Sequence, residues 1–137
     1  MAFWHLKSEP ETWSWDQQLR VGDENWDGVR NAQAMNNMKA MRAGDRAFFY
    51  HSGEERAVVG VVEIVKPWFP DPKDSSGKYG LVTVRTIKAM PRPVTLKAIK
   101  ANPKLAKMYL VRHSRLSVAP IDEEHWREVC RMGGYDG

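Results

Sequence analysis

Tryptophans at or near loops and the ends of expected elements are the first side chains of this sequence that could contact a ligand. Four of the six tryptophans among its 137 residues fall at or near expected loops, beside polar neighbours: Trp13, Trp15, Trp26 and Trp68. An indole face stacks on a nucleobase at about 1 to 3 kcal/mol and tolerates any base. Each of these side chains is a candidate wall for a flat ligand; alternatively, it holds its own loop against the core. Trp4 and Trp126 lie inside expected regular elements, where we expect core packing.

The segment Lys7-Ser8-Glu9 ends the first expected strand and could carry two kinds of chemistry. A lysine and a glutamate that converge at a strand end could act as acid and base in a hydrolysis. The same groups could donate to and accept from the Watson-Crick edge of a base, which requires no turnover. The residues alone leave both roles open.

Motifs for phosphate chemistry and metal binding are missing from the sequence. Neither GxxxxGK followed by Ser or Thr nor GxGxxG occurs, which disfavours nucleoside triphosphate chemistry. The histidines lack the spacing of metal sites, and Cys130, the single cysteine, cannot complete a zinc cluster. His51 and Ser52 do not form a catalytic pair, because adjacent residues of a strand point to opposite faces. We therefore expect no catalytic residue, no metal and no cofactor.

Basic residues are concentrated in one part of the chain. The net charge is +4, from 21 Lys and Arg against 17 Asp and Glu, yet the 47 residues between Asp74 and Asp122 hold ten basic side chains and no acidic one. This separation predicts a one-sided electrostatic field, which most often attracts phosphate or another polyanion. Alternatively, these side chains only solvate helix faces.

Length and composition predict one domain over residues 1–137 in a reducing compartment. The chain is 42% hydrophobic, which suffices for one apolar core without disulfides or metals. With one cysteine no intramolecular disulfide can form, so we expect a cytoplasmic protein. No run of 18 apolar residues occurs, and charged residues interrupt the first eleven positions, so we expect neither export nor membrane insertion.

Short strands and helices follow one another without a regular βαβ repeat. Strands are expected at residues 2–7, 46–51, 57–66, 81–88 and 115–119. Helices are expected after five capping residues: Ser14, Asn31, Thr95, Asn102 and Asp122. Gly44 should end the second helix and Gly133 the last. This order predicts an α+β fold, and we favour a small mixed barrel with helices on its outside.

Several segments resemble those of one known family, in order along almost the whole chain. The longest are residues 3–10 (FWHLKSEP), 26–31 (WDGVRN) and 44–52 (GDRAFFYHS), followed by 69–72 (FPDP), 91–96 (PRPVTL) and 115–118 (RLSV). Together they resemble the EVE domain family. The resemblance implies a PUA-like fold, a bent mixed β-barrel with short peripheral helices. It also implies kinship with YTH domains, which hold a methylated adenine of RNA in an aromatic cage, and with PUA-like modules that read modified cytosine in DNA.

The resemblance further implies a ligand pocket between the end of the first strand and the WDGVRN loop. Carried across position by position, it indicates ten residues: Lys7, Ser8, Glu9, Trp26, Val29, Arg30, Asn31, Tyr50, His51 and Ser52. YTH cages place several aromatics around the methyl group, whereas Val29 and Arg30 stand in the matching stretch here. The preference for methyladenine is therefore not carried over, and modified cytosine or another base stays open.

We therefore expect a non-catalytic module that binds DNA or RNA as a monomer and reads one modified base flipped out of its stack. Trp26 or Trp68 would cover the face of the base. Three residues would read its polar edge: Ser8, Glu9 and Asn31. The flanking phosphates would lie on basic residues: Arg30, Arg85, Lys88 and Arg92. Two alternatives stay open, a small hydrolase acting on modified nucleosides and a basic module that binds an acidic protein.

Overall fold

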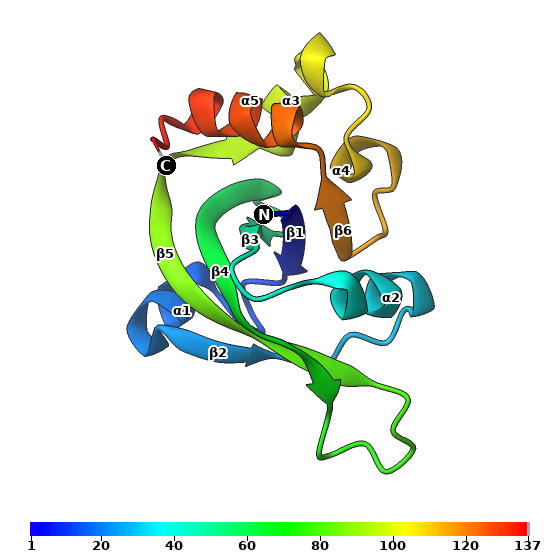
Figure 1. Ribbon diagram of the computed structural model, residues 1–137. Helices are drawn as coiled ribbons and strands as arrows, with labels where there is room; N and C mark the ends of the chain where they lie inside the picture. Colours follow the sequence, from blue (N-terminus) through cyan, green and yellow to red (C-terminus); the bar gives the residue numbers. More distant parts are fainter. Residues whose placement is uncertain (137) are drawn as a thin grey trace.

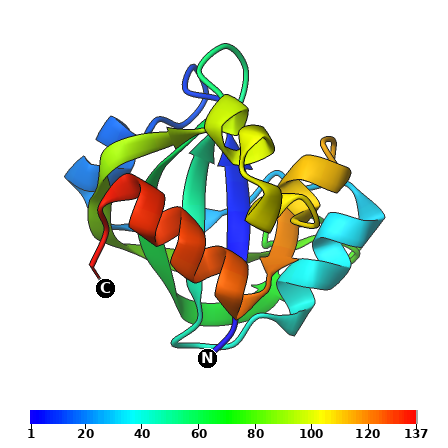
Figure 2. The same ribbon diagram turned by 90° about the horizontal axis from the view of Figure 1, so that it is seen from above.

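In the computed structural model, which describes residues 1–136, the strands form one six-stranded sheet in the order β2-β5-β4-β3-β1-β6. The strands are β1 (Phe3–Ser8), β2 (Asp23–Trp26), β3 (Arg46–His51), β4 (Ala57–Pro70), β5 (Gly80–Thr95) and β6 (Val118–Ile121). β1 and β3 are parallel, and the other neighbouring pairs are antiparallel. Figure 2 shows β1, in blue, between β3 and β6.

Five α-helices and one 3-10 turn surround the sheet. They are α1 (Trp15–Val21), α2 (Ala32–Ala40), α3 (Leu96–Ala101), the 3-10 turn Pro103–Leu105, α4 (Tyr109–Arg112) and α5 (Glu123–Gly133). In Figure 1, α3 and α5 lie on one side of the curved sheet, and α1, β2 and α2 lie toward the other. Among the described residues, no helix combines the length and the apolar character needed to cross a bilayer.

Local capping signals place most helix starts. Ser14 accepts from the amide of Gln17, whose side chain accepts in return from the Ser14 amide, so the capping box is confirmed. Asn31 and Thr95 also cap their helices through their side chains. The second helix ends earlier than expected, at Ala40, and Gly44 instead takes its left-handed φ of 94° in the turn before β3.

The core is divided between the two faces of the sheet. On β3, Ala47 and Phe49 point into one cluster with α1 and α2, whereas Phe48 and Tyr50 point into another with α3, α4 and α5. Both faces of β3 are therefore covered, which explains its continuous run of apolar residues. The predicted core positions of Trp4 and Trp126 are confirmed, at 6% and 5% exposed.

The α+β class is confirmed, but the expected barrel does not close. The edge strands β2 and β6 have four residues each, and the structure of residues 1–136 shows no ladder between them. A helix covers the free edge of β6, where Asn37 of α2 donates its side-chain amide to the Val118 carbonyl at 2.8 Å. The sheet is thus strongly curved with a gap between its edges (Figure 1).

Strands β4 and β5 form a long hairpin that extends beyond the limits expected from the sequence. β5 continues through Pro91 and Pro93, which lie past the end of β2 and fall in a register shift of the β4–β5 ladder, between the pairs Gly60–Ala89 and Val58–Val94. A proline lacks an N–H donor, and at such an irregularity that loss breaks no ladder bond. The four-residue strand β2 was not expected, because its residues are mostly polar, and β6 lies three residues later than its expected start.

Candidate functional site

A cleft of about 460 Å³ lies at the gap between the two edges of the sheet. One wall comes from β2 and the loop after it, and the other from the end of β1 and from Ser117, which precedes β6. The residues that line it are Lys7, Ser8, Glu9, Thr12, Trp13, Glu24, Asn25, Trp26, Asp27, Gly28, Val29, Arg30 and Ser117. The unclosed sheet therefore creates the cleft.

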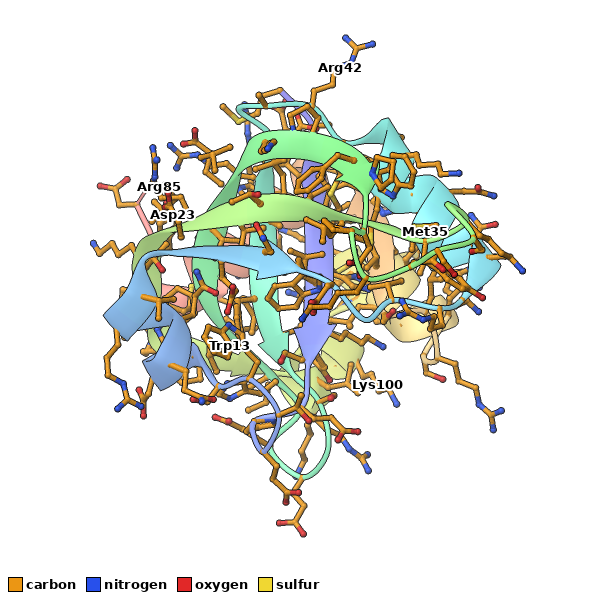
Figure 3. The ribbon with its side chains drawn as sticks, turned by 90° about the horizontal axis from the view of Figure 1, so that it is seen from below. Trp13, Asp23, Met35, Arg42, Arg85 and Lys100 are labelled. Atoms are coloured by element: carbon orange, nitrogen blue, oxygen red, sulfur yellow. The ribbon has the colours of Figure 1, made fainter. Side chains whose placement is uncertain are left out.

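Two indoles supply the aromatic surface of the cleft. Trp26 is 7% exposed, and its ring packs edge-on against Phe49 with the ring centroids 5.4 Å apart. Trp13, labelled in Figure 3, is half-buried, and its Nε1 donates to Oε1 of the buried Gln18 at 2.9 Å. Gln18 in turn donates to the Gly22 carbonyl at 2.9 Å. Both indoles are held by the fold before any ligand arrives, which is the preorganised arrangement that favours binding.

The end of β1 forms a rigid corner of the cleft. The Ser8 hydroxyl donates to the Trp13 carbonyl at 2.5 Å, and the Glu9 carbonyl accepts from the amides of Thr12 and Trp13. Lys7 donates its ammonium to the Ser114 carbonyl at 2.6 Å. Partial burial lowers the pKa of Lys7 from its ordinary value, because desolvation disfavours the charged form. Ser8 thus holds the Trp13 loop, and Lys7 ties the cleft to the segment before β6.

The cleft contains charges of both signs. Glu9, Glu24 and Asp27 supply carboxyl groups, and Lys7 and Arg30 supply cations. The Arg30 guanidinium lies over the ring of Tyr79, 4.5 Å from its centroid, which holds it at the rim. With more acids than bases, the cleft suits a ligand that offers hydrogen-bond donors, and it suits a phosphate poorly.

The structure brings six of the expected ligand residues into the cleft and leaves the others beside it. Lining it are Lys7, Ser8, Glu9, Trp26, Val29 and Arg30. Asn31 lies outside, and its side chain caps α2 by accepting from the Ala34 amide at 2.9 Å. Tyr50 packs in the core cluster under α5. His51 accepts from the Trp15 amide at 3.0 Å, and Ser52 donates its amide to the Ser8 carbonyl at 2.9 Å. These residues support the walls rather than line them.

Trp68 and three of the four residues expected to bind phosphate lie away from the cleft lining; the fourth, Arg30, lines it. The Trp68 indole packs on Gly80 and donates to the Met35 sulfur at 3.1 Å. Arg85 pairs with Asp23 through two hydrogen bonds of 2.9 and 3.1 Å (Figure 3). Two further basic residues lie farther along β5, where their side chains are exposed: Lys88 and Arg92. Arg92 donates to a carbonyl at the end of α5.

Seven residues that line the cleft were not among the ligand residues expected from the sequence: Thr12, Trp13, Glu24, Asn25, Asp27, Gly28 and Ser117. Trp13 carried a signal, since it is one of the loop tryptophans with polar neighbours. Two lining residues of β2, Glu24 and Asn25, carried no signal, because a short polar strand has no hydrophobic periodicity.

Within the described part of the chain, one group of side chains has the spacing for a metal ion. Asp122, Glu124 and His125 at the start of α5 have ligand atoms within 4.8 Å of one another. The two carboxyl groups are exposed, and three ligands are fewer than the four of a structural zinc site. None of these residues lines the cleft.

Comparison with characterised sequences identifies relatives over nearly the whole chain. Thymocyte nuclear protein 1 of Rattus norvegicus is 32% identical over 164 aligned residues, which cover 95% of this chain and 73% of that protein. The same protein of Gallus gallus is 34% identical, over 94% and 67%. These relatives are named as nuclear proteins, so our expectation of a cytoplasmic protein is wrong. A single cysteine indicates a reducing compartment, and the nucleus and the cytosol share that property.

Solved structures with the same fold agree with these relatives. An NMR structure of a Rhodopseudomonas palustris protein superposes with a TM-score of 0.94 at 52% identity, covering 98% of this chain and 94% of that one. Human THYN1 protein, solved in complex with 5-methylcytosine-containing DNA, gives 0.90 at 29% identity over the full length of both chains. A YTH domain of Zygosaccharomyces rouxii gives 0.61 at 16% identity over 96% of this chain and 86% of that one, which shows a shared fold alone.

The expected resemblance is confirmed by the match to a family model. The EVE domain model matches residues 2–132, which include every residue that lines the cleft. The chain belongs to the EVE domain family.

Proposed function

We propose that this chain is a non-catalytic nucleic-acid-binding module that captures one modified base in the cleft. The observation that carries the proposal is the preformed hollow with two fixed indoles at the sheet gap. Its volume of about 460 Å³ falls in the range of small-molecule sites. The complex of human THYN1 protein with 5-methylcytosine-containing DNA supports nucleic acid as the partner.

We infer that the base carries an exocyclic amino group. The indoles of Trp13 and Trp26 supply stacking surface, which does not distinguish bases. The carboxyl groups of Glu9, Glu24 and Asp27 are acceptors, and the N4 amino group of cytosine is a donor. Thymine has the same methyl group as 5-methylcytosine but presents an acceptor oxygen at the equivalent position. The cleft should therefore favour 5-methylcytosine over thymine through the amino group. Burial of the methyl group against the indoles should favour it over unmodified cytosine.

Fluorescence anisotropy with three oligonucleotides tests this function. They are identical except for one position, which is 5-methylcytosine, cytosine or thymine. We expect tighter binding to the first than to either of the others. Equal affinity for all three would contradict the reader function and would favour the alternative of a basic surface that binds any polyanion.

A pair of tryptophan variants separates stacking in the cleft from general stability. Trp13→Ala should weaken binding of the 5-methylcytosine oligonucleotide at least fivefold, since stacking on one indole contributes about 1 to 3 kcal/mol. Trp68→Ala is the matched control, because its indole is also half-buried but packs on Gly80 and Met35 outside the cleft. Thermal unfolding of both variants checks that they fold. Equal loss of binding in the two variants would contradict stacking in the cleft.

The structure gives the hydrolase alternative a specific test. In a hydrolase, Lys7 would donate or accept the proton. The ammonium of Lys7, however, already donates to the Ser114 carbonyl at 2.6 Å. This contact favours a positioning role for Lys7. We expect no free base or altered nucleoside after prolonged incubation with 5-methylcytidine and its deoxy form, followed by chromatography. Product that disappears in Lys7→Met would overturn the non-catalytic proposal.

We further propose that residues 1–137 bind as one domain and as a monomer. One copy of the chain supplies both walls of the cleft, from β2 on one side and β1 on the other. Size-exclusion chromatography with light scattering, with and without the oligonucleotide, should give the mass of one chain of 15.7 kDa plus the bound DNA. A protein mass of two chains would contradict this.

A further inference from the structure

A second hollow of about 360 Å³ adjoins the cleft and has no role in the function proposed above. Its lining residues are Asn31, Gln33, His113, Ser114, Arg115 and Leu116. Each wall continues a wall of the cleft, because Asn31 follows Arg30 in the chain and Leu116 precedes Ser117. The two hollows are therefore neighbours on the same side of the sheet gap.

The two hollows differ in charge. The cleft contains the carboxyl groups of Glu9, Glu24 and Asp27, whereas no residue lining the second hollow is acidic. The second hollow instead offers the guanidinium of Arg115 together with amide, hydroxyl and imidazole donors. A base that offers hydrogen-bond donors fits the cleft, and a phosphodiester, which offers only hydrogen-bond acceptors, fits the second hollow.

Arg115 is available to a ligand, unlike Arg85, one of the arginines that the sequence suggested for phosphate. In the structure of residues 1–136, the exposed Arg115 side chain has no ion-pair or hydrogen-bond partner, whereas Arg85 is neutralised by Asp23. An arginine that is not already paired gains a full charge-assisted contact when a phosphate binds. Arg115 is thus an unpaired cation that lines the second hollow, whereas Arg85 of β5 already has a carboxylate partner.

The backbone that presents Arg115 is fixed on both sides of that residue. The Ser114 carbonyl accepts from the Lys7 ammonium at 2.6 Å, and the Leu116 carbonyl accepts from His5 Nε2 at 3.0 Å. The next carbonyl, of Ser117, accepts from the Lys7 amide at 2.9 Å. Ordering this segment therefore costs little entropy when a ligand binds.

We propose that the second hollow binds the phosphodiester next to the captured base, with Arg115 as its principal contact. This inference rests on the proposed function, because it takes the cleft as the base site. It assigns the two parts of one nucleotide strand to two adjacent hollows. The base is selected by the acidic, indole-walled cleft, and the strand is positioned by the basic hollow beside it.

Salt-dependent binding of a charge-matched pair of variants tests the assignment. Arg115→Gln should weaken binding of methylated and unmethylated oligonucleotides by the same factor, about three- to tenfold, and should lower the slope of log affinity against log salt by about one. Arg42→Gln is the control, because Arg42 loses the same charge from an exposed side chain that lines neither hollow and points away from the body in Figure 3. It should leave both quantities almost unchanged. Identical slopes and affinities for the two variants would overturn the proposal.

A neutral backbone linkage places the contact at one phosphate. One methylphosphonate is introduced immediately 5′ or 3′ of the 5-methylcytosine. At one of these two positions the wild type should lose the same factor as Arg115→Gln, and the combination should show no further loss, since both changes remove one interaction. Additive losses at both positions would place Arg115 elsewhere and contradict the proposal.

The two proposals fail in different ways. If Arg115→Gln and the methylphosphonate give the expected coupling but methylated and unmethylated DNA bind alike, the base-reading function fails and the phosphate site stands. If the methyl preference and the Trp13→Ala effect hold without coupling at Arg115, the phosphate site fails alone. Absence of any binding to all oligonucleotides would refute both.

Discussion

Lowering the pH should destabilise this protein through one buried histidine. His5 lies in β1, an interior strand of the sheet between β3 and β6, and is 1% exposed. Its Nε2 donates to the Leu116 carbonyl at 3.0 Å, and its Nδ1 is buried without a partner. Protonation would place a second N–H, and a charge, where no acceptor is available. Burial therefore lowers the pKa of His5 from 6.5 to about 4, and the nearby Lys7 charge adds to this effect.

The direction and size of the effect follow from proton linkage. The pKa is lower in the folded than in the unfolded state, so the unfolded state takes up a proton first as the pH falls. The stability tied to neutral His5 is complete above pH 6.5 and is lost as the pH falls from 6.5 toward 4. Between pH 7 and pH 5 the free energy of unfolding should fall by about 2 kcal/mol from this group.

Urea unfolding at pH 7 and pH 5 measures this loss of stability against a variant that has no ionisable side chain at position 5. His5→Gln keeps a donor for the Leu116 carbonyl but carries no ionisable group. The variant should lose about 2 kcal/mol less than the wild type between the two pH values, while contributions from other groups cancel. Equal losses in the two proteins would refute the argument that His5 is held neutral in the core.

Three further substitutions test the packing and capping that hold the site. Gly60→Ala should destabilise by about 3 kcal/mol in urea unfolding, because a Cβ there would lie 2.3 Å from the Trp15 ring; a loss below 1 kcal/mol would show that the ring moves freely. Asp45→Ala should cost about 3 kcal/mol, since its carboxylate accepts from the Trp4 indole and two amides; retention of the wild-type melting temperature would contradict this. Ser14→Ala should lower the free energy of urea unfolding by about 1 kcal/mol, because the capping box is lost. Ser14→Asp keeps a capping oxygen and should retain the wild-type stability; an equal loss in both variants would contradict the role of the cap.

Local signals in the sequence predicted the elements that depend on local contacts. The cap at Ser14 acts within four residues, so it can be identified from Ser14 and Gln17 alone. Strand β3 has its expected limits, because a continuous apolar run between turns fits a strand covered on both faces. The family resemblance supplied the end of β1 and the loop after β2, which together provide the six expected residues that line the cleft.

Features that depend on distant contacts were not predictable in the same way. Strand β2 exists because Asp23 and Trp26 pair with residues of β5 about sixty positions later, and nothing in its own composition shows that. The open sheet follows from the short edge strands and from Asn37 binding the edge of β6. Ser117 lines the cleft only because its carbonyl accepts from the amide of Lys7. Asn31 was expected both as a helix cap and as a ligand residue, and in the structure its side-chain oxygen accepts from the Ala34 amide in the cap.

The interior position of β1 has a consequence for how the chain reaches its folded state. Its six residues are synthesised before those of the other five strands, yet they pair with β3 and with β6, and the residues of β6 are made more than a hundred positions later. Until then one flank of this apolar strand has no partner, and such strands are prone to aggregate. Contacts of such long sequence separation also slow folding. The final docking of β6 should therefore be the late step of folding, and a nascent chain paused before that strand should be the species most in need of a chaperone.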